Sequence, residues 1–152
     1  MKSAIAPDTV RRHYDGGIDQ GGAGMIYIVL NVMPIAAATM AGLLIGWIWL
    51  RLAGLAVPGA AVLVAIAAAE FWFAAILAGA LILAPAKASA WVMAIGSAIV
   101  IWIGFVAPAT IVTQAARRAS AKVIALDCGH WLAVMMIQAL VLKSIGLVPP
   151  PA

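Results

Sequence analysis

The sequence carries very little charge. Charged residues make up 9% of the chain and hydrophobic residues 66%, whereas about 25% charged residues is usual for soluble domains. A soluble domain of this length could not cover its surface with so few charges. The net charge of +4 comes from the polar chain start, the connections and the segment ends, and no basic face or stripe is visible. The composition therefore excludes an ordinary soluble domain and indicates no nucleic-acid binding.

The chain also has only one cysteine, Cys128. A single cysteine cannot make an intrachain disulfide, and no CxxC pair is present for a metal site. A nucleophile–base pair, a phosphate-cradling glycine loop and a redox motif are absent as well. We therefore assign no catalytic residue and no metal site, leave any cofactor unidentified and favour a protein that is not an enzyme.

Long apolar runs are what the sequence has in abundance. Each exceeds the ~20 residues that a helix needs to cross a hydrocarbon core of ~30 Å. A backbone in lipid must satisfy its own polar groups, so runs of this length are helices. Their short connections make consecutive helices antiparallel neighbours. The four runs lie at residues 25–50, 59–83, 90–114 and 121–142.

Together the runs predict an all-α integral membrane four-helix bundle over residues 25–143, surrounded by the lipid bilayer. Residues 1–24 are polar and Gly-rich and predict a short flexible tail, and residues 144–152 predict a Pro-rich C-terminal tail. Basic residues near the membrane divide equally between the two sides, so the positive-inside rule gives no orientation.

Small residues indicate how the helices pack. Gly42 and Gly46 follow Ala38 at four-residue spacing in the first run, and Gly96 and Gly104 lie eight residues apart in the third. Such ridges let a neighbouring backbone approach closely. We expect these glycines to pack within the bundle, together with Pro108 near the end of the third run.

Glu70 is the most informative polar residue, because it lies near the middle of the second run. A charged carboxylate at that depth costs roughly 2.5–3.5 kcal/mol even on insertion scales. We expect Glu70 to face the bundle interior, and to have a partner or carry a proton. It is either a functional group or a neutral hydrogen-bonding contact between helices.

The fourth run carries Asp127, His130 and Gln138. At 100° per residue these side chains share one helix face, and Asp127 and His130 can contact each other across one turn. Estimated depths place His130 within reach of Glu70. The sequence therefore predicts one polar pocket of Glu70, Asp127 and His130, with hydroxyls of the third run such as Thr110.

Such a pocket fits several chemistries. It can relay protons, bind one divalent metal or supply His130 as a ligand to a pigment or haem. A purely structural interpretation also stands, in which His130 and Asp127 hydrogen-bond and orient each other.

Two stretches carry a resemblance to a known family. IWIGFVAPAT (Ile101–Thr110) and LDCGHWLAVMMIQALVL (Leu126–Leu142) resemble the small bacterial membrane proteins grouped as domain of unknown function 1761. The resemblance implies four helices, a location in the bacterial cytoplasmic membrane, and importance for Asp127 and Pro108. It implies no activity. The sequence departs from the family pattern in its 24-residue tail and in having His130 where an aromatic residue is expected.

Three functions remain open at this point. The first is an accessory or structural subunit that packs against other subunits of a larger membrane assembly, because apolar faces are abundant and catalytic residues are not visible. The second is a small transporter or proton-coupled carrier using Glu70 and Asp127. The third is a membrane cofactor-binding protein using His130.

Overall fold

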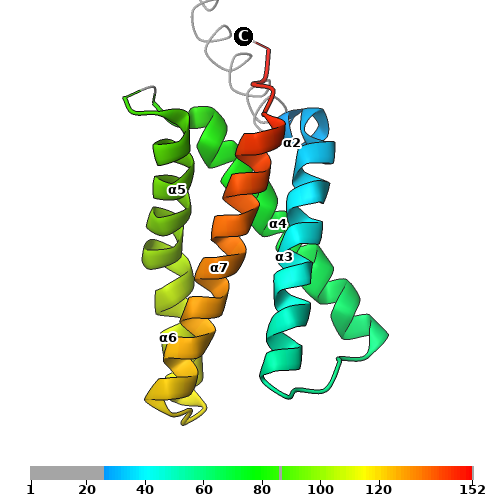
Figure 1. The fold of residues 1–152 in the computed structure, drawn as a ribbon, viewed down its shortest axis with the longest axis vertical. Helices are drawn as coiled ribbons and strands as arrows, with labels where there is room; N and C mark the ends of the chain where they lie inside the picture. Colours follow the sequence, from blue (N-terminus) through cyan, green and yellow to red (C-terminus); the bar gives the residue numbers. More distant parts are fainter. Residues whose placement is uncertain (1–25, 86, 152) are drawn as a thin grey trace, which may run out of the picture.

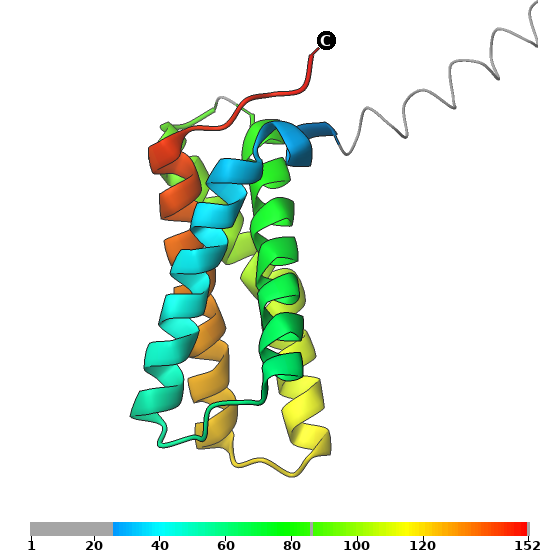
Figure 2. The same cartoon turned by 90° about the vertical axis from the view of Figure 1, so that its right-hand side faces the viewer.

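A computed structural model describes residues 26–85 and 87–151, which are arranged as four helical rods (Figures 1 and 2). Within these residues there is no strand, and four helices are long and apolar enough to cross a membrane. This confirms the predicted all-α, multi-pass membrane bundle. The predicted tail of residues 1–24 lies outside the described residues. The elements are α2 (Ile26–Leu30), α3 (Val32–Leu52), α4 (Ala60–Leu83), α5 (Ala90–Ile101), the π-helix η1 (Trp102–Val106), α6 (Ala107–Ala116) and α7 (Ala121–Ile145).

Helix α7 is the centre of the bundle. It packs extensively against α3 and against the rod formed by α5, η1 and α6, and less against α4. Many of the buried side chains between the rods are alanines, which allow the helix backbones to approach closely. The core cluster is Ile35, Ala38, Ala74, Ala75, Leu77, Ala78, Ala98, Val106, Met135, Ala139 and Leu142.

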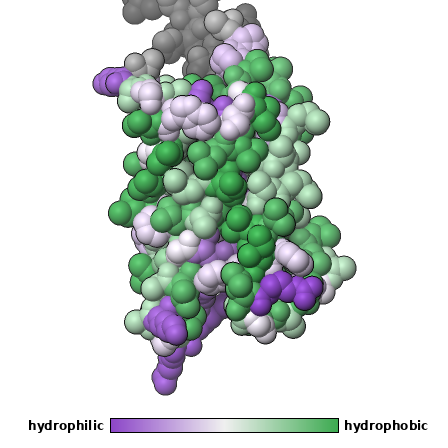
Figure 3. Space-filling model, in the orientation of Figure 1, coloured by the Kyte–Doolittle hydropathy of each residue, from purple (hydrophilic) through white to green (hydrophobic). Residues whose placement is uncertain are grey.

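The surface matches a lipid environment. Apolar side chains cover most of the flank of the bundle, while hydrophilic residues gather mainly toward its two ends (Figure 3). Large hydrophobic side chains stand exposed along every rod. In water such a surface would aggregate, whereas in a bilayer it meets acyl chains.

The third rod, Ala90–Ala116, is formed by α5, η1 and α6 and contains a widened turn beside Pro108. The Ala107 N–H donates to the carbonyl of Trp102, five residues back, which is the π-helical pattern. Pro108 has no N–H to donate to the preceding turn, so the helix opens there. Pro108 is exposed, and its role is in the backbone of its own rod. The expectation that it packs between helices is therefore corrected.

Helix α4 is packed in its second half only. Its buried residues all lie between Glu70 and Ala78. The first ten residues, Ala60–Ala69, contribute none, and this part of the helix extends away from the lower end of α3 (Figure 1).

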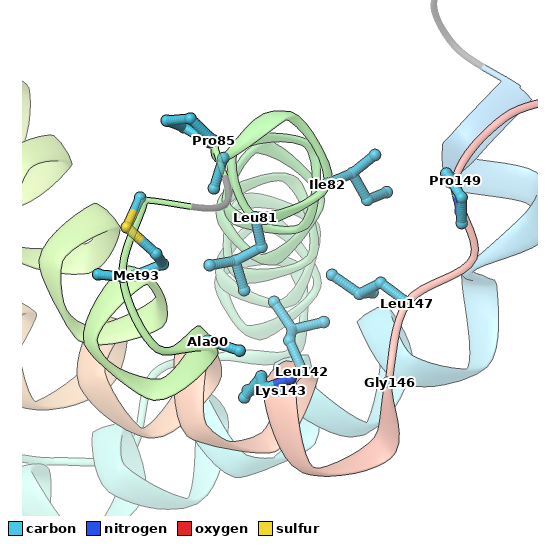
Figure 4. A pocket seen from close by; sticks show the side chains of 12 residues that line it. Leu81, Ile82, Pro85, Ala90, Met93, Leu142, Lys143, Gly146, Leu147 and Pro149 are labelled. Carbon is cyan, nitrogen blue, oxygen red and sulfur yellow. The ribbon is translucent and has the colours of Figure 1, made fainter.

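At the opposite end of the bundle, Asn31 ties the C-terminal segment to α3. Its amide nitrogen donates to the Val148 carbonyl at 2.8 Å, and its amide oxygen accepts from the Val148 N–H at 2.7 Å. Asn31 is fully buried. The chain reaches it because α7 continues to Ile145, past its predicted end, and then turns at Gly146 with φ 92°. Figure 2 shows the last residues passing over the junction of α2 and α3, and Figure 4 shows Leu147 and Pro149 of this segment lining a pocket with Leu81 and Ile82 of α4.

We predict that Asn31→Ala frees the C-terminal segment. Both hydrogen bonds to Val148 are lost, and the free energy of unfolding should fall by about 1–3 kcal/mol. Hydrogen exchange in nanodiscs should show faster exchange of the Val148 amide. Ser144→Ala is the control, since the Ser144 hydroxyl is exposed and bonds only to its own helix. Unchanged protection of Val148 in Asn31→Ala would contradict the role assigned to Asn31.

Candidate functional site

Glu70 lies inside the bundle and has a partner on α7. Its side chain is 2% exposed, and its Oε2 accepts a hydrogen bond from Gln138 Nε2 at 2.7 Å. The same nitrogen lies 3.4 Å from the Glu70 carbonyl oxygen. Gln138 is also fully buried, and within the described residues its Oε1 has no hydrogen-bond partner. The carboxyl–amide pair therefore joins α4 to α7 in the middle of the bundle.

Gly42 on α3 makes room for this pair. A Cβ at Gly42 would lie 2.5 Å from Glu70 Oε2 and 2.7 Å from Gln138 Nε2. Real Cβ atoms do not come this close to other heavy atoms, so a side chain at position 42 would force the ends of Glu70 and Gln138 to shift and would disturb their hydrogen bond. Gly42 thus brings a third rod into contact with the pair.

The other predicted packing glycines behave differently. A Cβ at Gly46, Gly96 or Gly104 would meet no atom within 4 Å, so these positions are not points of close approach. The prediction that Gly46, Gly96 and Gly104 pack closely against neighbouring helices is therefore corrected. A close approach that the spacing did not indicate lies at Gly79, where a Cβ would be 2.9 Å from the Tyr27 hydroxyl oxygen. That hydroxyl donates to the carbonyl of Ala75 at 3.2 Å.

Asp127 belongs to a second, separate pair. Its Oδ2 accepts a hydrogen bond from Gln114 Nε2 on α6. Thr110 and Thr113 line the same hollow, which has a volume of about 390 Å³ and lies between the third rod and α7. Asp127 and Thr110 therefore come together as predicted, but Glu70 does not line this hollow.

His130 packs against aromatic rings rather than hydrogen-bonding to Asp127. Its imidazole stacks on Trp49 of α3, with ring centroids 5.2 Å apart and planes inclined by 20°. The ring of Trp131, the next residue, is tilted by 57° against the imidazole, with ring centroids 5.5 Å apart. Nδ1 is buried and has no hydrogen-bond partner among the described residues. Among the described residues His130 therefore stacks on Trp49 and makes no hydrogen bond to Asp127, which the purely structural interpretation had offered.

A groove between α3 and the first half of α4 unites two of the predicted residues. Its volume is about 760 Å³, and Glu70 and His130 both line it. Its other walls are apolar or aromatic, including Trp47 and Trp49 from α3 and Trp131 from α7. The predicted single polar pocket is thus divided: Glu70 and His130 line this groove, Asp127 and Thr110 line the hollow beside α6, and Gln138 is fully buried between helices.

The polar groups present suit hydrogen bonding better than metal coordination. Among residues 26–85 and 87–151, no three His, Cys, Asp or Glu side chains are placed to hold a metal ion together. The polar side chains of the two cavities and of the central pair are the carboxyls of Glu70 and Asp127, the amides of Gln138 and Gln114, and the imidazole of His130. Each of them contacts a side chain of another helix.

Sequence reasoning missed Asn31 and the aromatic partner of His130. Asn31 stands in an apolar run just as Glu70 does, so the same criterion would have selected it. Trp49 lies at the end of its run and is typical of an interface anchor, which gives no indication of its contact with His130.

A scan against protein-family models, a search of curated proteins and a search of solved structures each found no match. The resemblance to domain of unknown function 1761 stays a prediction.

We predict that Gly42→Ala destabilises the bundle by about 1–3 kcal/mol, because the new methyl group overlaps the Glu70–Gln138 pair. Gly46→Ala, one turn further along the same helix, meets no neighbour and should be neutral or stabilising by up to about 1 kcal/mol through helix propensity. Unfolding of both variants in mixed micelles measures the difference. Equal stability of the two variants would contradict the close contact at Gly42.

We also predict that Glu70 and Gln138 are energetically coupled. A double-mutant cycle with Glu70→Ala and Gln138→Ala should give about 1–2 kcal/mol, at the upper end of values for hydrogen bonds between membrane helices. The Gln114–Asp127 cycle should give less, because both side chains are partly exposed. A larger coupling for Gln114–Asp127 would reverse the assignment of the central contact.

Proposed function

We propose that the protein is a non-catalytic subunit that packs against a larger membrane assembly. The observation that carries this proposal is the first half of α4, Ala60–Ala69, which contributes no buried residue to its own bundle. This stretch is rich in alanine. Small side chains let another helix come close, and helix association in lipid depends on such close packing.

One face of α4, which begins in this half and continues past Glu70 to Trp72, is suited to a partner. Ala61, Ala68 and Trp72 recur at helical spacing, are exposed and do not line the α3–α4 groove. We call them the outer α4 face. Two small residues beside an aromatic one offer a shallow apolar surface on which a transmembrane helix of another subunit can pack.

The carrier function that uses Glu70 and Asp127 has less support. Each carboxyl is bonded to a different amide, Gln138 or Gln114. The two carboxyls also line different cavities. No chain of hydrogen bonds among the described residues joins the two pairs.

The proposal predicts that bulk on the outer α4 face releases the partner. Ala61→Leu combined with Ala68→Leu keeps the helix apolar and should lower recovery of the assembly at least fivefold. Ala36→Leu is the matched control, being the same change at an exposed position of α3. The measurement is native electrophoresis from membranes in a mild detergent, with photo-crosslinking from position 61 to identify the neighbour.

Two outcomes would overturn the proposal. One is a protein that migrates at the mass of a single chain and gives no crosslink from position 61. The other is an assembly that survives the double substitution as well as it survives the control.

A further inference from the structure

The α3–α4 groove is a cavity that this chain does not fill with its own side chains. Its volume of about 760 Å³ falls within the range of about 300–1,000 Å³ that is usual for small-molecule sites. It lies between two membrane-spanning helices, so an occupant enters from the bilayer. Alanine, valine and leucine side chains form most of its α4 wall, which suits an apolar chain.

The polar end of the groove lies deep in the membrane. Glu70 is ten residues after Ala60, the first residue of α4. At 1.5 Å per residue this is about 15 Å along the helix, which is half of a hydrocarbon core of about 30 Å. A phospholipid keeps its headgroup at the interface and cannot bring it to this depth. An occupant that uses Glu70 must instead carry its polar atoms inside the hydrocarbon layer.

The groove's aromatic lining favours a flat ring. Trp47, Trp49 and Trp131 line it together with His130, and His130 already stacks on Trp49. Aromatic faces stack on planar conjugated rings. A neutral imidazole has one N–H donor, and a ring carbonyl is an acceptor for it.

We propose that the groove binds a membrane-dissolved quinone. The ring lies against the tryptophans with a carbonyl oxygen accepting from the His130 N–H, and the apolar tail runs along the first half of α4 toward the lipid. In the reduced form, a ring hydroxyl donates to a Glu70 carboxyl oxygen. This inference goes beyond the proposed function, because it uses the groove face of α4 and does not require a partner on the outer α4 face.

Gly46 is the position at which binding in the groove is tested, because it lines the groove and a Cβ there would meet no atom within 4 Å. Gly46→Leu should place its side chain in the groove without disturbing the fold. Gly104→Leu is the matched control: its Cβ position is equally open, and it does not line the groove. His130→Phe keeps an aromatic ring and removes the nitrogen donor.

The experiment titrates decylubiquinone into the full chain in phosphatidylcholine nanodiscs and follows quenching of tryptophan fluorescence. We expect saturable quenching in the original protein and in Gly104→Leu. Gly46→Leu should weaken binding at least tenfold. His130→Phe should weaken it about fivefold, as expected for the loss of one hydrogen bond. Thermal unfolding of each variant identifies any that fails to fold, and His130→Phe then carries the test if Gly46→Leu does not fold.

Hexadecanol, an apolar chain with a flexible hydroxyl head, is the competitor that separates a ring site from an acyl-chain site. Weak competition by hexadecanol supports a site that recognises the quinone ring. The proposal is overturned if hexadecanol displaces decylubiquinone at equal concentration and His130→Phe binds normally, because the groove then accepts any chain. Non-saturable quenching that is identical in all variants also overturns it, since it shows partitioning into lipid alone.

Discussion

The bundle depends on one requirement: a polar group in hydrocarbon needs a partner within the protein, because an unsatisfied one costs several kcal/mol. Glu70 on α4 meets this requirement through Gln138 on α7. The contact sets how these two helices lie along each other. It also depends on Gly42 on α3, since a Cβ there would push the ends of both polar side chains out of their present positions. Three of the four rods therefore meet at this one pair.

Other inter-helix contacts follow the same rule. The Trp102 indole donates to the carbonyl of Cys128 at 2.9 Å, and Gln114 donates to Asp127, so two bonds join the third rod to α7. Apolar packing alone gives little direction to helices in lipid, because acyl chains are as apolar as leucine. Directional bonds select one arrangement among many of similar packing. Trp102 and Cys128 lie in the stretches Ile101–Thr110 and Leu126–Leu142, so those two stretches contact each other.

The four spans could be predicted from run length and hydropathy, whereas the partners of the polar residues could not. A helix face gives the angle of a residue about the axis and leaves open which rod it meets at each depth. Asp127 and Gln138 share a face of α7, but they lie eleven residues apart, or about 16 Å. At one depth the neighbour is α6 and at the other it is α4. Glycine spacing has a similar limit, because an absent side chain permits close approach at Gly96 or Gly104 without bringing a neighbour there.

Glu70 also marks the point where α4 changes from a packed helix to an unpacked one. Beyond it the buried residues Ala74, Ala75, Leu77 and Ala78 join the core, and before it the helix contributes none. The alanine side chains of Ala60–Ala69 are too small to fill the space between this stretch and α3. The two faces of α4 therefore differ: the groove face has the Glu70 carboxyl at its inner end, whereas the outer α4 face has no ionisable group. A partner helix on the outer face would hold Ala60–Ala69 in place and keep the groove open, so a subunit contact and a ligand site can support each other on one short stretch of helix.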